Sequence, residues 1–364
     1  MKKRNKTLVC LMAACLLSLA LFSWLKPADA FSASERRGLK QFPKLTVETL
    51  IDGTFARNFE SYALDQFPLR DTFRSIKSLT AGYVFQQQDV NGLYVHDGHI
   101  ASVEYPMNPD SLEWAAGRFQ NIYEMYLKGT ETRLYFSIIP DKGYFLAEES
   151  GHLAMDYGAF VADMTKQVPY LDYIDIMNQL TADDYYLTDS HWKQTNLLGV
   201  VQMLAERMDV PLNTAYETVD LEKPFYGVYY GQLARPMKAD TLSYLTNDQL
   251  EQCKVFDWQN NKDLPMYDSK KATGKEPYEM FLGGPLSLVT IENPHAATDR
   301  ELVMFRDSFG SGIAPLFAES YRKITLVDIR YIQPAILKNY IEFDQQDVLF
   351  LYSTSVLNNS STIM

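Results

Sequence analysis

The sequence predicts an α/β fold in which a parallel sheet lies between two layers of helices. From about residue 111, short apolar segments alternate with segments of helical periodicity. The apolar segments are nearly continuous, as in strands buried on both faces. With 364 residues, of which 46% are hydrophobic and 22% charged, the chain can build such a core and still hold an insertion or a small second part.

The first thirty residues have the pattern of a targeting segment. Four basic residues precede an apolar run over residues 8–25, and Ala28-Asp29-Ala30 has the small-x-small form of a cleavage site. The run is long for a signal peptide and near the lower limit for a membrane span. We therefore expect residues 1–30 to be a signal peptide or a signal anchor. The protein would then act outside the cytoplasm, either secreted or anchored to the outer face of the cytoplasmic membrane.

Charge and cysteine content exclude some functions. The targeting segment holds five positive charges and one negative charge, so its removal changes the formal net charge from -12 to -16. A domain this acidic is a poor candidate for binding nucleic acid. Only Cys253 lies beyond residue 30, so the exported part has no intrachain disulfide.

Residues 31–110 form an N-terminal lead-in that we expect to pack on the core. Its clearest element is "NGLYVHDGHI", which predicts a short hairpin around Asp97-Gly98. His96 and His99 flank the turn and are expected to be exposed.

The core, residues 111–364, begins with a helix for which Ser111 is the expected N-cap. The elements expected next are a strand at 133–139, a helix at 157–167, a strand at 171–175 and a helix at 196–208. Thr195 is the expected N-cap of the last of these helices. Residues 211–300 break the rhythm and are expected to form a β-containing insertion or lid. Strands are again expected at "ELVMF", "KITLV" and "VLFLYS".

Ser308 is the candidate nucleophile. Ligands of open parallel sheets bind beyond the carboxyl ends of the strands, and Ser308 follows "ELVMF" in a polar turn before Gly310 and Gly312. A turn of this kind exposes a hydroxyl and points helix N–H groups at an oxyanion. The alternative is that Ser308 only caps the next helix.

His191 is the candidate general base. It lies directly ahead of a helix, and Asp189 two residues earlier can hold its Nδ1–H while Nε2 accepts the Ser308 proton. A metal site is the competing use of an Asp-x-His pair. It would need further ligands that this sequence does not cluster, so we expect no metal and no cofactor.

Other polar residues follow the strand ends. Lys142 and Arg330 either line the substrate groove and contact substrate hydroxyls or developing charge, or form ion pairs on the surface or within the sheet. Tyr331 is grouped with them as a candidate substrate contact. The backbone N–H groups of Ser308 and Phe309 are the candidate oxyanion donors.

These motifs resemble those of a known family. "YLTDSHW" resembles the D-x-H-W signature of bacterial DHHW proteins, and "FRDSFG" resembles the G-D-S-[FY] serine block of SGNH hydrolases. Together with "IIPDK" and "VDIRYI", they make the chain similar to the alginate O-acetyltransferase-like group that includes AlgX and AlgJ. In that group the Asp-x-His precedes the serine, an order circularly permuted relative to ordinary SGNH esterases. The resemblance implies an SGNH or flavodoxin-like three-layer sandwich.

The resemblance also implies a function. It predicts a serine-dependent O-acetyltransferase of a cell-surface or secreted polysaccharide, with Ser308, His191 and Asp189 as the triad and a membrane-bound O-acyltransferase partner supplying acetyl groups. A carbohydrate esterase with the same triad and a catalytically silent cell-envelope binding or assembly protein are the alternatives. Two features depart from the family pattern: Arg306 stands where the serine block begins with Gly, and no asparagine is evident for the oxyanion hole.

Overall fold

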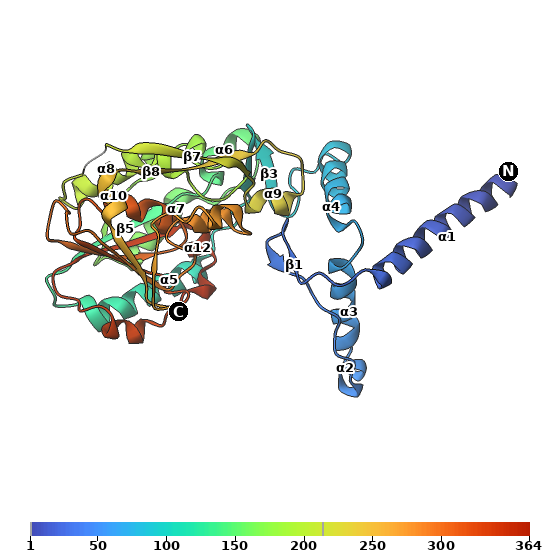
Figure 1. Ribbon diagram of the computed structural model, residues 1–364, viewed down its shortest axis with the longest axis horizontal. Helices are drawn as coiled ribbons and strands as arrows, with labels where there is room; N and C mark the ends of the chain where they lie inside the picture. Colours follow the sequence, from blue (N-terminus) through green and yellow to red (C-terminus); the bar gives the residue numbers. More distant parts are fainter. Residues whose placement is uncertain (1, 213–214) are drawn as a thin grey trace. The chain divides into compact units, whose positions relative to one another are not determined.

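The computed structural model describes residues 2–212 and 215–364, and these divide into two compact units (Figure 1). One unit comprises Met1–Asn91 and Tyr230–Pro236, and the other comprises Gly92–Tyr229 and Met237–Met364. The boundary between residues 229 and 230 falls within α9 (Val228–Leu233).

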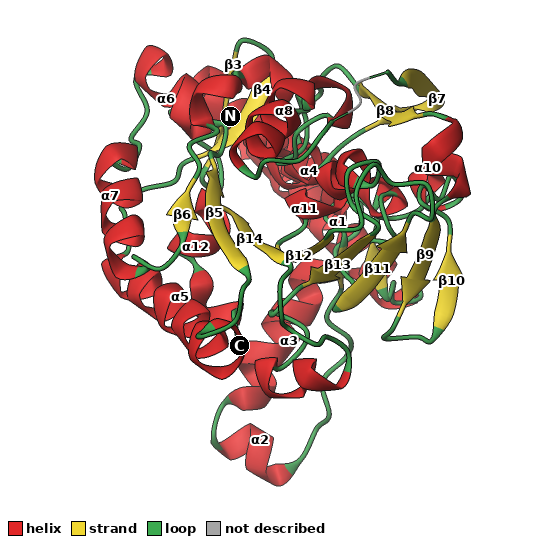
Figure 2. Ribbon diagram, turned by 90° about the vertical axis from the view of Figure 1, so that its left-hand side faces the viewer, coloured by secondary structure: helices red, strands yellow, loops and turns green. Residues whose placement is uncertain are grey.

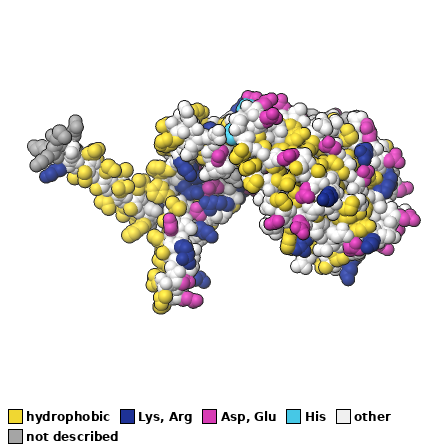
Figure 3. Space-filling model, turned by 180° about the vertical axis from the view of Figure 1, so that it is seen from behind, with side chains coloured by type: hydrophobic (Ala, Val, Ile, Leu, Met, Phe, Trp, Pro, Cys, Tyr) yellow, Lys and Arg dark blue, Asp and Glu magenta, His cyan; other side chains and the backbone are white. Residues whose placement is uncertain are grey.

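The first unit begins with the long apolar helix α1 (Lys2–Leu25). Its segment Asn5–Leu25 has a mean hydropathy of 2.4 and none of it is buried, and Figure 3 shows hydrophobic side chains along it. By length and composition it can cross a membrane, a test that signal sequences and anchors both pass. This unit also contains β1 (Phe31–Ser32), β2 (Arg37–Gly38), α2 (Val47–Ile51), α3 (Thr54–Asp65), α4 (Arg70–Leu79) and the π-helical segment Thr80–Val84.

The second unit is built on an eight-stranded sheet, whose order is β10-β9-β11-β13-β12-β14-β5-β6 (Figure 2). Its strands are β5 (Arg133–Ile139), β6 (Asp172–Tyr173), β9 (Lys254–Asp257), β10 (Lys262–Leu264), β11 (Leu288–Glu292), β12 (Glu301–Arg306), β13 (Lys323–Val327) and β14 (Asp347–Ser353). The five strands from β6 to β13 pair in parallel, whereas β11, β9 and β10 extend the sheet with antiparallel pairs.

Helices cover both faces of this sheet. The helices of the second unit are α5 (Pro109–Ile122), α6 (Gly143–Ser150), α7 (Tyr157–Gln167), α8 (Leu198–Arg207), α10 (Asp248–Gln252), α11 (Phe309–Ile313) and α12 (Thr354–Asn358). Leu302 and Met304 of β12 pack in one buried cluster with α8 and α11, and Val303 and Phe305 pack in another with α5, α7 and α12. The predicted α/β fold is therefore confirmed.

The sheet nevertheless differs from the expected purely parallel one. Its three antiparallel strands come from residues 211–300, the segment expected to form an insertion. Four of the five residues of β11 are buried, so burial of apolar surface favours its place in the sheet. The same segment also contains the hairpin of β7 (Glu217–Phe225) and β8 (Asp240–Thr246).

Several predicted boundaries hold and two predicted caps are wrong. The helix α7 spans the expected residues, and β3 (Leu93–His96) and β4 (His99–Ser102) form the predicted hairpin. The N-cap of α5 is Asn108, followed by Pro109, whereas the Ser111 hydroxyl donates to the Leu357 carbonyl.

The start of α8 also differs from the prediction. A 3₁₀ turn over Gln194–Asn196 precedes this helix, so Thr195 does not cap it. The Thr195 hydroxyl instead donates to the Asn196 side chain.

Candidate active site

The Ser308 turn lies at the carboxyl end of β12, which pairs in parallel with β13 on one side and β14 on the other. Two glycines allow its tight passage into α11. A Cβ on Gly310 would lie 2.6 Å from the Cβ of Arg306, and one on Gly312 would lie 2.6 Å from the Tyr278 hydroxyl oxygen. Ser308 occupies the N-cap position, but its side chain makes no capping hydrogen bond. Its hydroxyl is directed to another group.

That group is the imidazole of His191. The His191 Nε2 lies 2.8 Å from Ser308 Oγ, and His191 Nδ1 lies 2.6 Å from Asp189 Oδ1. Because an ionised carboxylate only accepts hydrogen bonds, Nδ1 carries the proton and Nε2 can accept the proton of the serine hydroxyl. The Asp189 side chain is buried, whereas that of His191 is 16% exposed and Ser308 is partly exposed. A substrate can therefore reach the serine but not the carboxylate.

Aromatic rings hold the imidazole. Tyr278 stacks on His191 with ring centroids 3.9 Å apart and planes inclined by 11°, and Phe309 contacts the imidazole at 4.9 Å. Trp192 follows His191 in the sequence, and its Nε1–H donates to the Phe309 carbonyl at 3.1 Å. Trp192 therefore joins the histidine segment to the serine turn.

Residues beyond position 211 complete the surroundings of Asp189. The Val228 N–H donates to Asp189 Oδ2 at 2.8 Å, and Asp240 accepts hydrogen bonds from the backbone just before Asp189. Gly227 lies so close that a Cβ there would be 2.2 Å from the Asp189 Cβ. Sequence reasoning missed Asp240 and Tyr278, because both act from a segment without a recognisable motif.

The two expected oxyanion donors differ in availability. The Phe309 N–H donates to Asp307 Oδ1 at 3.0 Å. Asp307 also accepts hydrogen bonds from the Ser353 N–H and hydroxyl, and this fixes the turn to β14. Within residues 2–212 and 215–364, the Ser308 N–H has no hydrogen-bond acceptor. It is the donor of the two that remains available.

Lys142 is buried under the Asp189 segment. Its Nζ donates to the Tyr186 carbonyl at 2.9 Å and to the Leu187 carbonyl at 3.4 Å. Burial lowers the pKa of Lys142 to about 7, although the negative charges of Asp189 and Asp240 act to raise it. The structure therefore places Lys142 behind the site and in contact with its backbone.

Arg330 and Tyr331 lie beyond the end of β13. Arg330 donates to both carboxylate oxygens of the buried Asp328, at 2.9 and 2.7 Å. Burial lowers the pKa of Arg330, but hydrogen bonds and the charge of Asp328 outweigh burial and raise it above its ordinary value. Tyr331 is 52% exposed and its ring lies 5.4 Å from the Arg330 guanidinium carbon. In the described chain neither residue has a contact that joins it to Ser308 or His191.

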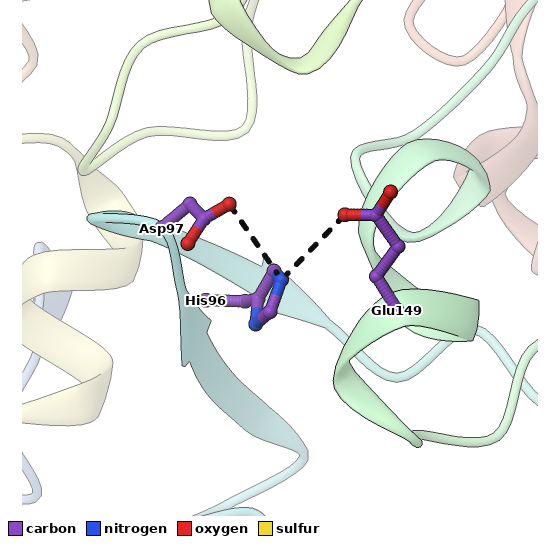
Figure 4. Close-up of side chains that lie close together, drawn as sticks. All are labelled: His96, Asp97 and Glu149. Carbon is purple, nitrogen blue, oxygen red and sulfur yellow. Dashed lines mark ion pairs between the residues drawn. The ribbon is translucent and has the colours of Figure 1, made fainter.

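One further cluster brings together an imidazole and two carboxylates, which are groups that bind metal ions in many proteins. His96 Nε2 lies 3.7 Å from an Asp97 oxygen and 3.9 Å from a Glu149 oxygen (Figure 4). Both carboxylates are about three-quarters exposed, and the three groups are one ligand short of a closed tetrahedral site. Both hairpin histidines were expected to be exposed, but His99 is 2% exposed and His96 is only partly exposed.

Comparison with known proteins identifies structures of similar fold. No protein-family model matches the sequence, and no curated protein matches it. A DHHW family protein from Eubacterium siraeum superposes with a TM-score of 0.61 at 23% identity, covering 76% of this chain and 95% of its own. Bacillus cereus PatB1 with a sulfonyl adduct gives a TM-score of 0.57 at 18% identity, covering 74% and 97%.

A weaker likeness, with a TM-score of 0.44 at 13% identity, links 73% of this chain to 92% of the O-acetyltransferase domain of Pseudomonas putida AlgJ. At these identities the comparisons concern the fold. The predicted resemblance to DHHW proteins is confirmed at that level, because the chain has the α/β fold of a DHHW family protein.

Proposed function

We propose that this protein is an extracytoplasmic serine-dependent O-acetyltransferase that modifies a cell-surface or secreted polysaccharide. The observation that carries the proposal is the hydrogen-bonded chain Asp189–His191–Ser308 at the carboxyl end of a parallel sheet. This arrangement of nucleophile, base and orienting carboxylate is suited to acyl transfer.

In the first half-reaction, Ser308 Oγ attacks the carbonyl carbon of the acetyl donor while His191 Nε2 takes the hydroxyl proton. The Ser308 N–H donates a hydrogen bond to the developing oxyanion. As the carbonyl re-forms, the bond to the leaving group breaks, and the leaving group receives the proton from Nε2. Asp189 stabilises the imidazolium that exists between these two proton transfers. The product is an acetyl ester on Ser308.

In the second half-reaction, a sugar hydroxyl takes the place of the leaving group. His191 Nε2 removes its proton, the sugar oxygen bonds to the acetyl carbon, and the Ser308–acetyl bond breaks with return of the proton to Ser308. General base catalysis of this kind contributes about 10²- to 10⁴-fold. The acidic charge of the chain favours a neutral glycan over an anionic one.

Hydrolysis is the second candidate reaction. The same residues would pass the acetyl group to water, and the partial exposure of His191 and Ser308 gives water access to the ester. The protein would then be a carbohydrate esterase. The ratio of acetylated glycan to free acetate measures which acceptor the site prefers.

The cellular setting in this proposal follows from α1. A helix of this hydropathy near the N-terminus would direct the α/β unit across the cytoplasmic membrane and either be cleaved or remain as an anchor. A membrane-bound O-acyltransferase partner would then supply acetyl groups on the outer side, as the resemblance to the AlgX and AlgJ group implies.

Covalent labelling tests the proposal. The protein is treated with 4-nitrophenyl acetate or a sulfonyl fluoride, and peptide mass spectrometry locates the adduct. We expect the label on Ser308 and none in Ser308→Ala. Ser311→Ala is a matched control, because Ser311 is buried in the same helix and its hydroxyl has no partner among the described residues.

Acetyl transfer is then measured with neutral oligosaccharides as acceptors. A wild-type protein that takes no label and releases no acetate, yet binds glycan, would overturn the enzymatic proposal and leave a cell-envelope binding protein. Full activity in Ser308→Ala would overturn the assignment of the nucleophile.

A further inference from the structure

Asp189 sits in a tight loop whose base is closed by backbone pairing. Tyr185 and Trp192 form a β-bridge, and the Tyr186 N–H donates to the His191 carbonyl at 3.1 Å. These bonds fix the two ends of the loop. They leave the peptide groups on either side of Leu187 to be oriented by other residues, and those groups lead directly into Asp189.

The carboxylate of Asp240 holds the N–H groups of both peptides. Its Oδ1 accepts from the Leu187 N–H at 2.7 Å, and its Oδ2 accepts from the Thr188 N–H at 2.9 Å and from the Thr188 hydroxyl at 2.5 Å. Asp240 is 6% exposed and begins β8, more than forty residues after the loop. Few waters could replace these bonds if the carboxylate were lost.

Lys142 holds the carbonyl groups of the same two peptides. The carbonyl of Tyr186 belongs to the peptide whose N–H is on Leu187, and the carbonyl of Leu187 belongs to the peptide whose N–H is on Thr188. Both carbonyls accept from Lys142 Nζ, and the Leu187 carbonyl also accepts from the Ile100 N–H at 2.8 Å. The N–H ends of these two successive peptides are thus held by the Asp240 carboxylate, and their carbonyl ends by Lys142 Nζ together with the Ile100 N–H.

The Thr188 hydroxyl connects this arrangement to Asp189. While it donates to Asp240, it accepts from the Gly227 N–H at 2.8 Å, and the next N–H, that of Val228, donates to Asp189 Oδ2. A change at Asp240 would therefore reach Asp189 along two routes, through the loop backbone and through residues 227–228.

We propose that Asp240 is a positioning residue of this site, which together with Lys142 fixes the peptide planes around Leu187 and thereby aims Asp189 at His191. This inference rests on the proposed function and adds to it a residue outside the triad. Asp240 has no contact with Ser308 or His191 in the described chain. It acts only through the placement of Asp189.

The test is Asp240→Asn in the full-length protein. An asparagine has one acceptor oxygen for three donors and would turn its NH₂ toward at least one of them. We expect the rate of Ser308 acetylation by 4-nitrophenyl acetate to fall about 10- to 100-fold, the range that a displacement near 1 Å costs a catalytic group. Asp257→Asn is the matched control, because Asp257 is also a buried carboxylate that accepts from two backbone N–H groups and one side chain.

The pH profile distinguishes positioning from loss of fold. Among the described residues, the ionisable side chains that contact His191 are Asp189 and Tyr278, and the Ser308 hydroxyl lies against Nε2. When Asp189 is misaligned, the imidazolium loses its anionic partner, so the acid limb of kcat/KM moves to lower pH. A variant that is only partly unfolded would have a lower kcat/KM at every pH, but the pH of its acid limb would be unchanged.

If Asp240→Asn does not fold, Thr188→Val serves as the second variant, because it removes the hydroxyl between Asp240 and Gly227. The same shift of the acid limb is expected. An unchanged rate and profile in a folded Asp240→Asn or Thr188→Val protein would overturn the inference, provided that Ser308→Ala is inactive. Activity in Ser308→Ala would instead overturn the proposed function.

Discussion

The buried side-chain amino group of Lys142 predicts that the stability of the protein depends on pH, and a single substitution would remove this dependence. Its pKa falls from 10.5 to about 7 on folding, chiefly because burial disfavours the charged form. Between these values the unfolded chain binds a proton that the folded chain lacks. The free energy of unfolding therefore rises with pH in this window, by up to about 1.4 kcal/mol per pH unit and by about 5 kcal/mol over its whole width.

Lys142→Met removes this titration but keeps a side chain of similar length. We expect the difference in unfolding free energy, wild type minus variant, to grow steadily from about pH 7 to about pH 10. The measurement is urea denaturation of both proteins across that range. Lys338→Met is the control, because Lys338 is exposed and its difference should stay constant. A Lys142→Met difference that is flat, or that shrinks as pH rises, would refute the burial argument.

Two further substitutions test the surroundings of the site. Gly227→Ala should abolish Ser308 labelling and lower the melting temperature, because the new Cβ would lie 2.2 Å from the Asp189 Cβ. Gly117→Ala is the control: this glycine of α5 has open space around it, so the change should be neutral or stabilise the protein by about 1 kcal/mol. Arg330→Gln should destabilise the fold by about 2 kcal/mol through Asp328, as urea denaturation would show. Unchanged stability with impaired acetyl transfer would favour the substrate-contact interpretation of Arg330.

The sequence predicts the parts of the site that short, contiguous sequence patterns specify. An apolar strand followed by a polar turn and glycines points to Ser308, and an Asp-x-His pair before a helix points to His191. The structure brings both side chains to hydrogen-bond distance. The boundary of α5 could also have been found, since Asn108-Pro109 is a stronger helix start than Ser111.

Other features depend on contacts between distant segments and leave no local pattern. The start of α8 is displaced because the Gln194 side chain donates to the Gly312 carbonyl and accepts from the Leu245 N–H. Tyr278 stacks on His191, yet the surrounding sequence "KEPYEMFL" carries no motif. A pairing of this kind becomes visible only when the tertiary structure places the two rings together.

The segment 211–300 is therefore better understood as part of the site than as a lid over it. It gives the N–H of Val228 to Asp189, the carboxylate of Asp240 to the preceding backbone and the ring of Tyr278 to His191. It also supplies three strands of the main sheet. Removing it would leave Asp189 with an unsatisfied buried oxygen and would expose the edge of β13. A shortened chain would thus lose the groups that hold Asp189 and His191 in place. Loss of activity on truncation would therefore not by itself indicate a substrate-binding lid.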